Sequence, residues 1–192
     1  MKYCVSHKIT IAALIHFVFG KMLMELSQSD DVCFISIGSG RTADDAYLPG
    51  MFFVNFPVRL KRGNSLVDCQ MQLISSQEYM NLLAVEEPEF MSDWKKCYAV
   101  LDVVNLFADN GQKLKKINTF ELAETPEQNK KFIENFISEN IEEFSWRFLI
   151  DTDEQLGFIC AGSYNAACYD SAYMEKISQN FLRQLRMIIN GD

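Results

Sequence analysis

The N-terminal part of the chain combines a helical segment with a strand-like run. Between Thr10 and Leu26 the residues are mostly apolar, and Thr10 is a residue type that caps helix N-termini. The stretch "VCFISIG" (32–38) is a largely apolar run bounded by polar residues, which is typical of a buried strand. We therefore expect a largely buried helix over 10–26, followed by a buried strand.

The next segments alternate strand and helix patterns. "GMFFVNFPVRLK" (50–61) predicts a strand, and Pro57 places it at a sheet edge or at an irregularity because proline cannot donate to a ladder. A helix capped by Ser65 is predicted over 64–83. "CYAVLDVVNLF" (97–107) predicts a third strand. The apolar positions of the predicted helix are Leu66, Val67, Cys69, Met71 and Leu73.

The C-terminal half begins with a polar, lysine-rich stretch and ends in an amphipathic pattern. Thr125 and Pro126 open a predicted helix over 125–143. "FSWRFLI" and "QLGFICAGSYN" predict a hairpin joined at "DTDE". The last helix begins after a cap at Asp170 or Ser171 and stops at Asn190 and Gly191. Its apolar stripe consists of Met174, Ile177, Phe181, Leu185 and Ile188.

This order of elements defines the expected fold class. It runs helix, strand, strand, helix, strand, helix, two strands, helix over 192 residues. Such an order predicts an α/β (α+β) two-layer sandwich, with a mixed sheet covered by helices.

Composition removes several function classes. The formal net charge of -8 argues against a duplex nucleic-acid binder, which needs a basic face. Six cysteines without a CxxC pair, and only two histidines, give no structural zinc pattern, so we predict no metal ligands. The cysteines fit buried, reduced thiols of a cytoplasmic protein. The N-terminal apolar run is too short for a membrane span and lacks an A-x-A cleavage site, so a buried helix is favoured over a signal peptide.

An ordered series of motifs gives the chain a resemblance to a known family. "DD" opens the strand in "DDVCFISIGSGR" (30–41), an "SGR" turn closes it, and "PGMFFVNFPVR" (49–59) follows a spacer. "FSWRFLIDTDEQLGFICAGSYNAACYD" (144–170) leads into the last helix. From about Lys8 to Gly191 the chain resembles the C-terminal half of the condensation domain of nonribosomal peptide synthetases, in the chloramphenicol-acetyltransferase-like superfamily.

The resemblance implies a function for the parent protein and a limited role for this chain. It implies that residues 1–192 form a single C-terminal condensation subdomain, with an extra excursion at about 108–143. The implied parent is an acyltransferase that joins carrier-bound substrates by an amide bond. The implied partners are the N-terminal half of the domain and a peptidyl or aminoacyl carrier protein, without nucleic acid or membrane. No cofactor is expected to bind directly, and the substrates are linked to phosphopantetheine.

The same match supplies candidates for the substrate tunnel or cleft, namely Ser39, Arg41, Asn55 and Arg59. Both arginines could instead be structural, each pairing with a carboxylate. In an ungapped match the family's Asn position holds Val54, and Asn55 falls where Thr is usual. Since a one-residue offset turns a strand side chain to the other face, either a local bulge restores Asn55 or the polar contact is lost.

The catalytic motif of the family, HHxxxDG, is absent from this sequence. His16 stands alone in an apolar helix and His7 lies near a terminus, so we expect packing or surface roles for them and assign no catalytic residue. The chain is therefore expected to be inactive alone. The short basic cluster "KRGN" (61–64) is expected to be a solvated turn, with a contact to a phosphopantetheine phosphate as the alternative.

Alternatives to this function stay open. The chain could be half of a stand-alone O- or N-acyltransferase that uses coenzyme A, half of an epimerization-type relative, or a non-catalytic module that docks a carrier protein. An isolated half would expose a face that its partner normally covers, and this predicts a homodimer unless the extra segment folds back over the face. The large apolar side chains expected there are Met51, Phe53, Phe56, Phe132 and Phe136.

Overall fold

The structure is a computed structural model that describes residues 2–39, 53–83, 99–104, 146–153, 157–164 and 169–191. The described helices are α1 (Lys2–His7), α2 (Ile11–Ser27), α3 (Leu66–Leu83) and α6 (Ser171–Asn190). The described strands are β1 (Asp31–Ser39), β2 (Phe53–Lys61), β3 (Ala99–Val104), β4 (Trp146–Asp153) and β5 (Gly157–Tyr164). The described elements follow the predicted order, with α1 as an additional helix, and the helix predicted over 125–143 lies outside the described residues.

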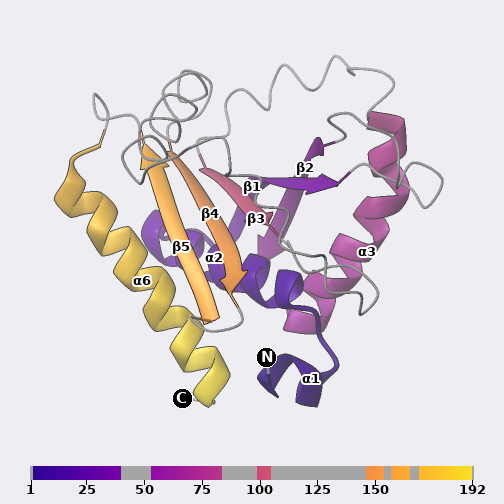
Figure 1. Cartoon of the computed structure of the whole chain (residues 1–192), viewed down its shortest axis with the longest axis horizontal. Coiled ribbons are helices and arrows are strands. Elements are labelled where there is room, and N and C mark those ends of the chain that lie inside the picture. Colours follow the sequence, from indigo (N-terminus) through magenta and orange to yellow (C-terminus); the bar gives the residue numbers. More distant parts are fainter. Residues whose placement is uncertain are drawn as a thin grey trace, which may run out of the picture.

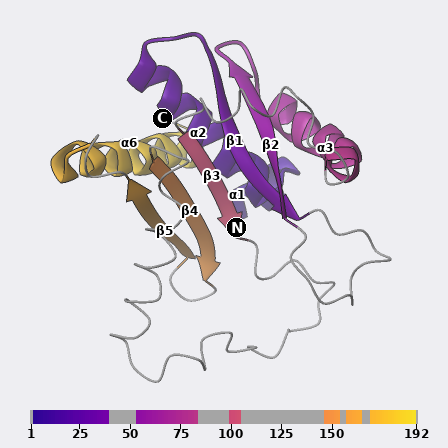
Figure 2. The ribbon, with the colours of Figure 1, turned by 90° about the horizontal axis from the view of Figure 1, so that it is seen from above.

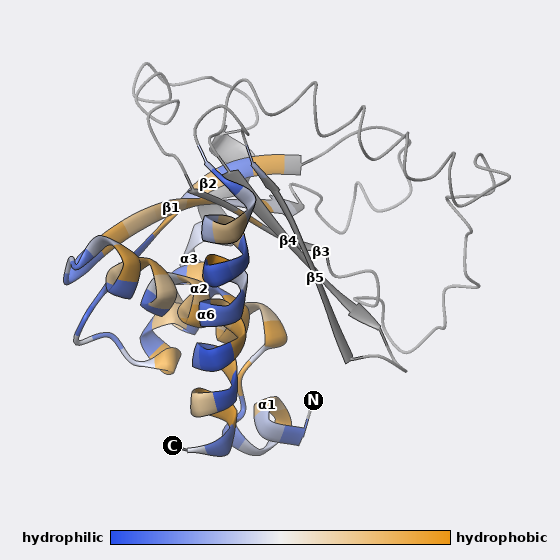
Figure 3. Ribbon diagram, turned by 90° about the vertical axis from the view of Figure 1, so that its left-hand side faces the viewer, coloured by the Kyte–Doolittle hydropathy of each residue, from blue (hydrophilic) through white to orange (hydrophobic). Residues whose placement is uncertain are grey.

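The described strands form one mixed five-stranded sheet in the order β2-β1-β3-β4-β5. The outer pairs β1–β2 and β4–β5 are antiparallel, whereas β3 runs parallel to both β1 and β4. The described helices α2, α3 and α6 lie on one side of this sheet (Figures 1 and 3). The predicted two-layer α/β fold is thereby confirmed.

The central helix α2 begins and packs as its sequence predicts. Thr10 is its N-cap, and the Thr10 hydroxyl accepts a hydrogen bond of 3.0 Å from the backbone N–H of Ala13. The helix is largely buried, and it contacts β1, β2 and β3 of the sheet and α3 and α6 among the helices. A Cβ atom added at Gly20 would lie 2.7 Å from Leu60 Cδ2, so the glycine permits the close approach of α2 to β2.

The C-terminal helix α6 also follows its sequence signals. The Asp170 side chain accepts a 2.7 Å hydrogen bond from the Tyr173 N–H, and Gly191 ends the helix with a φ of 76°. A left-handed φ is the conformation that glycine adopts without strain. Four of the five predicted stripe residues are buried, and Ile188 is half-buried.

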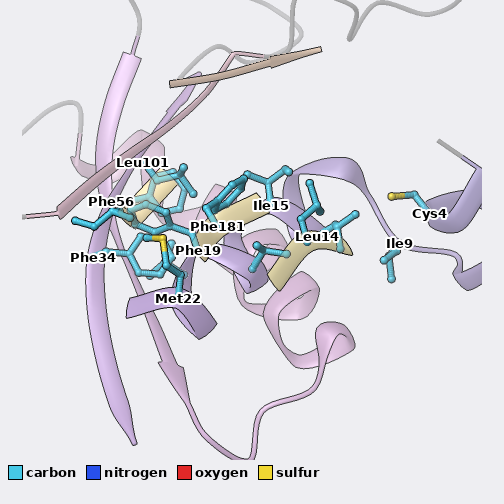
Figure 4. Packing of buried hydrophobic residues seen from close by; sticks show 14 of the residues in the cluster. Cys4, Ile9, Leu14, Ile15, Phe19, Met22, Phe34, Phe56, Leu101 and Phe181 are labelled. Carbon is cyan, nitrogen blue, oxygen red and sulfur yellow. The ribbon is translucent and has the colours of Figure 1, made fainter. Parts of the chain in front are cut away.

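Sheet and helices meet in one main core. Figure 4 shows Phe34, Phe56 and Leu101 of the sheet against Phe19 and Met22 of α2 and Phe181 of α6. The rings of Phe19 and Phe34 pack edge to face with their centroids 4.9 Å apart. Such contacts stabilise the packing of α2 on β1, because they bury apolar surface and because the edge-to-face arrangement of the rings is favourable. Phe56, expected at an exposed face, is 5% exposed, so that expectation is wrong for this residue.

Three further expectations need correction. Val67 and Met71 of α3 are 57% and 56% exposed, so the apolar residues of this helix lie on two sides instead of one. The "DTDE" turn begins later than predicted, since β4 continues through Asp153. Of the cysteines expected to be buried, Cys4 and Cys69 are buried, but Cys33 is exposed because it lies on the side of β1 away from the core.

Other expectations lie outside the described residues. These include Arg41, Met51, the side chain of Phe53, the helix 125–143 with Phe132 and Phe136, and the excursion 108–143. Among the described helices, none is long and apolar enough to cross a membrane.

Candidate functional site: the outer face of the β1–β2 pair

The candidate residues fall on β1 and β2, whose pairing is regular. The register runs from Asp31 opposite Lys61 to Ser39 opposite Phe53, without a bulge in between. Val54, Phe56, Val58 and Leu60 alternate into the core, and Val32 and Phe34 join them from β1. The intervening residues lie on the side away from the helices, which we call the outer face.

This register shows whether a bulge turns Asn55 to the face that the family's Asn occupies. Because β2 contains no bulge, Val54 lies on the core face and Asn55 lies on the outer face. Val54 is 8% exposed, whereas Asn55 is half-buried opposite Ile37. The contact expected from the family's Asn position is therefore lost, because Val54 occupies that position in the core, and the amide of Asn55 lies on the opposite, outer face.

The candidates lie in two groups along the strands. Ser39 ends β1 opposite Phe53, and Asn55 is two residues along β2 from that end. Arg59 lies opposite Cys33, near the other end of the pair. The structure thus places Ser39 near Asn55 but does not bring Arg59 to them, and Arg41 lies outside the described residues.

Arg59 is bound by a carboxylate of the "DD" pair. Its Nε lies 2.8 Å from Oδ1 of Asp31 and its Nη2 lies 2.6 Å from Oδ2, which is a bidentate ion pair. The hydrogen bond from Arg59 lowers the pKa of the Asp31 carboxyl. The neighbouring Asp30 forms an ion pair with Arg62, in which Oδ1 lies 2.5 Å from Nη2. Both carboxylates therefore hold arginines at the start of β1, which supports the structural alternative for Arg59.

His16 makes a hydrogen-bonded pair with Ser36 inside the core. Its Nδ1 lies 2.7 Å from the carbonyl oxygen of Ala12, and its Nε2 lies 2.6 Å from Oγ of Ser36. A carbonyl can only accept, so Nδ1 carries the proton and Nε2 accepts from the Ser36 hydroxyl. His16 is 4% exposed and Ser36 is fully buried.

A serine bonded to a histidine is also half of a nucleophile arrangement, and burial decides against that use here. Desolvation lowers the pKa of His16 to about 4, so the imidazole is neutral at ordinary pH. Both ring nitrogens are occupied, and neither side chain reaches solvent. The pair satisfies two buried polar groups, which is the packing role predicted for His16.

Sequence reasoning did not identify Ser36. The available signal was its position, because Val32, Phe34 and Ser36 alternate along β1 and share one face. A polar residue at such a buried position requires a hydrogen-bond partner. Its partner is twenty residues away and becomes its neighbour only when α2 packs on β1.

The other histidine is on the surface. His7 ends α1, and its ring stacks on that of Tyr3 with the centroids 4.1 Å apart. Its Nδ1 lies 2.9 Å from the Tyr3 carbonyl oxygen. Within the part of the chain that the structure describes, no three His, Cys, Asp or Glu side chains gather closely enough to hold a metal ion.

An open groove lies elsewhere, along α6 beside the end of α2. It has a volume of about 550 Å³ and contains the ion pair between Arg183 and Glu25. None of the candidate residues lines it. We therefore base the candidate site on the outer face and not on this groove.

Comparison with known proteins shows which solved structures share this fold. No family model and no curated protein sequence matches the chain. The epimerization domain from the third module of tyrocidine synthetase B matches with a TM-score of 0.63 and 10% identity over 98% of this chain and 43% of that chain. The condensation domain from Monacolin K polyketide synthase matches with a TM-score of 0.65 and 15% identity over 98% and 43%.

A third match, PapA2 acyl transferase, has a TM-score of 0.55 and 9% identity over 98% of this chain and 40% of that chain. The chain therefore spans about two fifths of the length of these structures. At such identities the likeness concerns the fold. The chain is similar in structure to a part of these condensation-type proteins that makes up about two fifths of their length. This agrees with the resemblance of its motifs to half of a condensation domain.

Proposed function

We propose that this chain is the C-terminal half of a condensation-type acyltransferase of nonribosomal peptide synthesis. In the reaction, an amine attacks a carrier-bound thioester, the carbon–sulfur bond breaks, and an amide and a free thiol form. The chain supplies one wall of the substrate tunnel and the contacts to the N-terminal half. The fold likeness to condensation domains over nearly the whole chain supports this class.

The burial and hydrogen bonding of His16 are the observation that supports assigning catalysis to the N-terminal half and not to this chain. The sequence has two histidines, and His16 is buried with both ring nitrogens hydrogen-bonded. A general base must reach the proton that it removes, and His16 cannot reach a substrate on the outer face. The catalytic histidine therefore comes from the partner half, and this chain is inactive alone.

Ser39, Arg41 and Asn55 are the residues proposed to face the cleft. Ser39 and Asn55 lie near the same end of the β1–β2 pair, and Asn55 presents an amide on the outer face. We propose a structural role for Arg59, because its guanidinium forms a bidentate ion pair with Asp31 and so links β2 to the start of β1. The proposed cleft thus begins at the Ser39 end of the strands.

The proposed substrates reach this face on phosphopantetheine arms of carrier proteins, and the chain itself binds no separate cofactor. The "KRGN" segment is a less suitable phosphate site than its charge suggests. Arg62 is paired with Asp30, and Asn64 hydrogen bonds to the backbone of Lys61. We therefore place the carrier contact at the Ser39 end.

Two alternatives share the fold. One is half of a stand-alone acyltransferase, for which we propose coenzyme A as the acyl carrier, and a match to an acyl transferase fits this class. The other is half of a racemising relative, and a match to an epimerization domain fits this class. The three differ in what carries the acyl group and in whether an amide forms. A carrier-dependent amide product supports the proposal, whereas coenzyme A dependence or racemisation without an amide supports an alternative.

Binding to the chain tests the proposal. Purified 1–192 is titrated with phosphopantetheinylated carrier protein, with the same carrier lacking the arm, and with acetyl-coenzyme A. The proposal expects binding that depends on the carrier's arm and is weaker for Asn55→Ala, with Lys61→Ala as the matched outer-face control. Preferential binding of acetyl-coenzyme A favours the second candidate, and equal binding of both carrier forms contradicts a cleft role for Asn55.

A further inference from the structure

Strand β2 is an edge of the described sheet, and α3 lies beside it (Figure 2). An exposed edge presents backbone N–H and C=O groups that can pair with a strand of another molecule. The fate of these edge groups therefore decides whether the sheet can extend by strand addition.

The β1–β2 pairing shows which backbone groups point outward. The N–H of Arg62 donates to the carbonyl of Asp30 at the end of the ladder. In an antiparallel pair such hydrogen-bonded positions alternate with positions whose groups point away. Residues 54, 56, 58 and 60 of β2 therefore face β1, and residues 55, 57, 59 and 61 direct their backbone groups to the edge.

Three successive edge positions offer no free donor. Pro57 has no N–H. The N–H of Arg59 donates to Oε1 of Gln72 in α3 at 3.2 Å. The N–H of Lys61 donates to Oδ1 of Asn64 at 2.7 Å, and the N–H of Asn64 donates back to the Lys61 carbonyl at 2.9 Å.

We propose that Pro57, Asn64 and Gln72 form an edge cap that prevents β2 from pairing with β2 of a second copy of this chain. A second copy is the partner considered because two identical edges related by a two-fold axis form an antiparallel, self-complementary pair. Such a pair would extend the sheet beyond β2. Gln72 blocks this pairing because its side chain reaches from α3 to β2 and accepts the hydrogen bond of the Arg59 N–H. That N–H is then not available to a strand of a second copy.

The cap is tested by removing its acceptor without shortening the side chain. Gln72→Met deletes Oε1, whereas Gln72→Glu keeps an acceptor oxygen for the Arg59 N–H. Pro57→Thr adds a donor to the edge. Gln70→Met is the positional control, because Gln70 lies two residues away and bonds to the N–H of Thr10 and the carbonyl of Lys8 instead.

Sedimentation equilibrium measures self-association of the full 192-residue chain and its variants, and amide hydrogen exchange locates the contact. We expect Gln72→Met combined with Pro57→Thr to dimerise about tenfold more tightly than the wild type, since two edge donors become available. Protection should appear at residues 55–61 on association. Gln72→Glu and Gln70→Met should behave as the wild type.

Two results would overturn the edge cap. One is a folded double variant whose association constant equals that of the wild type. The other is an equal increase for Gln70→Met, because an added methionine and not an opened edge would then be the cause. If the double variant does not fold, Pro57→Thr alone decides, with a smaller increase expected and an unchanged constant counting against the cap.

Discussion

The two faces of the β1–β2 pair both present polar side chains, but these side chains have different roles on each face. On the core face, Ser36 hydrogen bonds at 2.6 Å to His16 of α2, whose other ring nitrogen bonds to the Ala12 carbonyl, and the pair has a packing role. On the outer face, Asn55 is half-buried and Arg59 is exposed beside Asp31. Reactive residue types thus indicate function only together with access to solvent, and the outer face is where the proposed substrate cleft lies.

The largest expected effect is on the core face. Phe34→Ala removes a fully buried ring that contacts Phe19, and we expect it to lower the free energy of unfolding by about 3–5 kcal/mol. Urea denaturation measures the loss. A loss no larger than that of the outer-face variant Asn55→Ala would show that the two faces are assigned the wrong way round.

Acid should weaken the core face through His16. The imidazole pKa falls from 6.5 to about 4 in the folded protein, so between these values the unfolded chain binds a proton that the native protein excludes. Stability is therefore full above pH 6.5 and decreases as the pH falls, by at most about 1.4 kcal/mol per pH unit.

The control for this acid effect is His16→Gln, which cannot titrate but keeps an acceptor for Ser36. Urea denaturation at several pH values should give the variant a shallower loss of stability than the wild type. Carboxylates such as Asp31 titrate equally in both proteins and cancel in the comparison. Identical slopes would contradict a buried, neutral histidine.

Adjacent residues of β2 sharpen the comparison further. Val54→Ala removes buried methyl groups and should cost about 2 kcal/mol of unfolding free energy. Asn55→Ala should cost about 0.5 kcal/mol or less, as outer-face substitutions usually do. Thermal melts of both variants measure the difference, and a reversed order would mean that β2 is shifted by one residue.

The smallest expected effect concerns the ion pair of Asp31 and Arg59. Both side chains are substantially exposed, at 41% and 59%, so solvent screens their attraction. Asp31→Asn should lower the melting temperature only slightly, and added salt should reduce the difference from the wild type. A loss comparable to that of Phe34→Ala would assign the pair a much larger structural role.

Local signals made much of the fold predictable. Thr10, Asp170 and Gly191 mark helix ends through interactions within a few residues, and each is used as expected. The faces of β2 follow from the two-residue period of a strand. For α3 the helical spacing of apolar residues did not predict the buried side, because Val67 and Met71 are apolar and exposed while Cys69 is buried. Apolar residues on both sides of a helix do not define its buried side.

The site was less predictable because its contacts join distant parts of the chain. The bonds from Ser36 to His16 and from Arg59 to Gln72 depend on how α2 and α3 pack on the sheet. The sequence motifs predicted Asn55 and Arg59 as candidates, but not that Asp31 would occupy Arg59. Pairing of that kind requires the register of β1 against β2.

The most direct measurement of the central claim is amide formation from an aminoacyl thioester and an amine. Four samples are compared: 1–192 alone, the His16→Gln variant alone, and a mixture of each of these with a separately produced N-terminal half that carries HHxxxDG. The account predicts no product from the chain alone and equal rates in the two mixtures. Product from the chain alone that is lost in His16→Gln, with the fold intact, would contradict it.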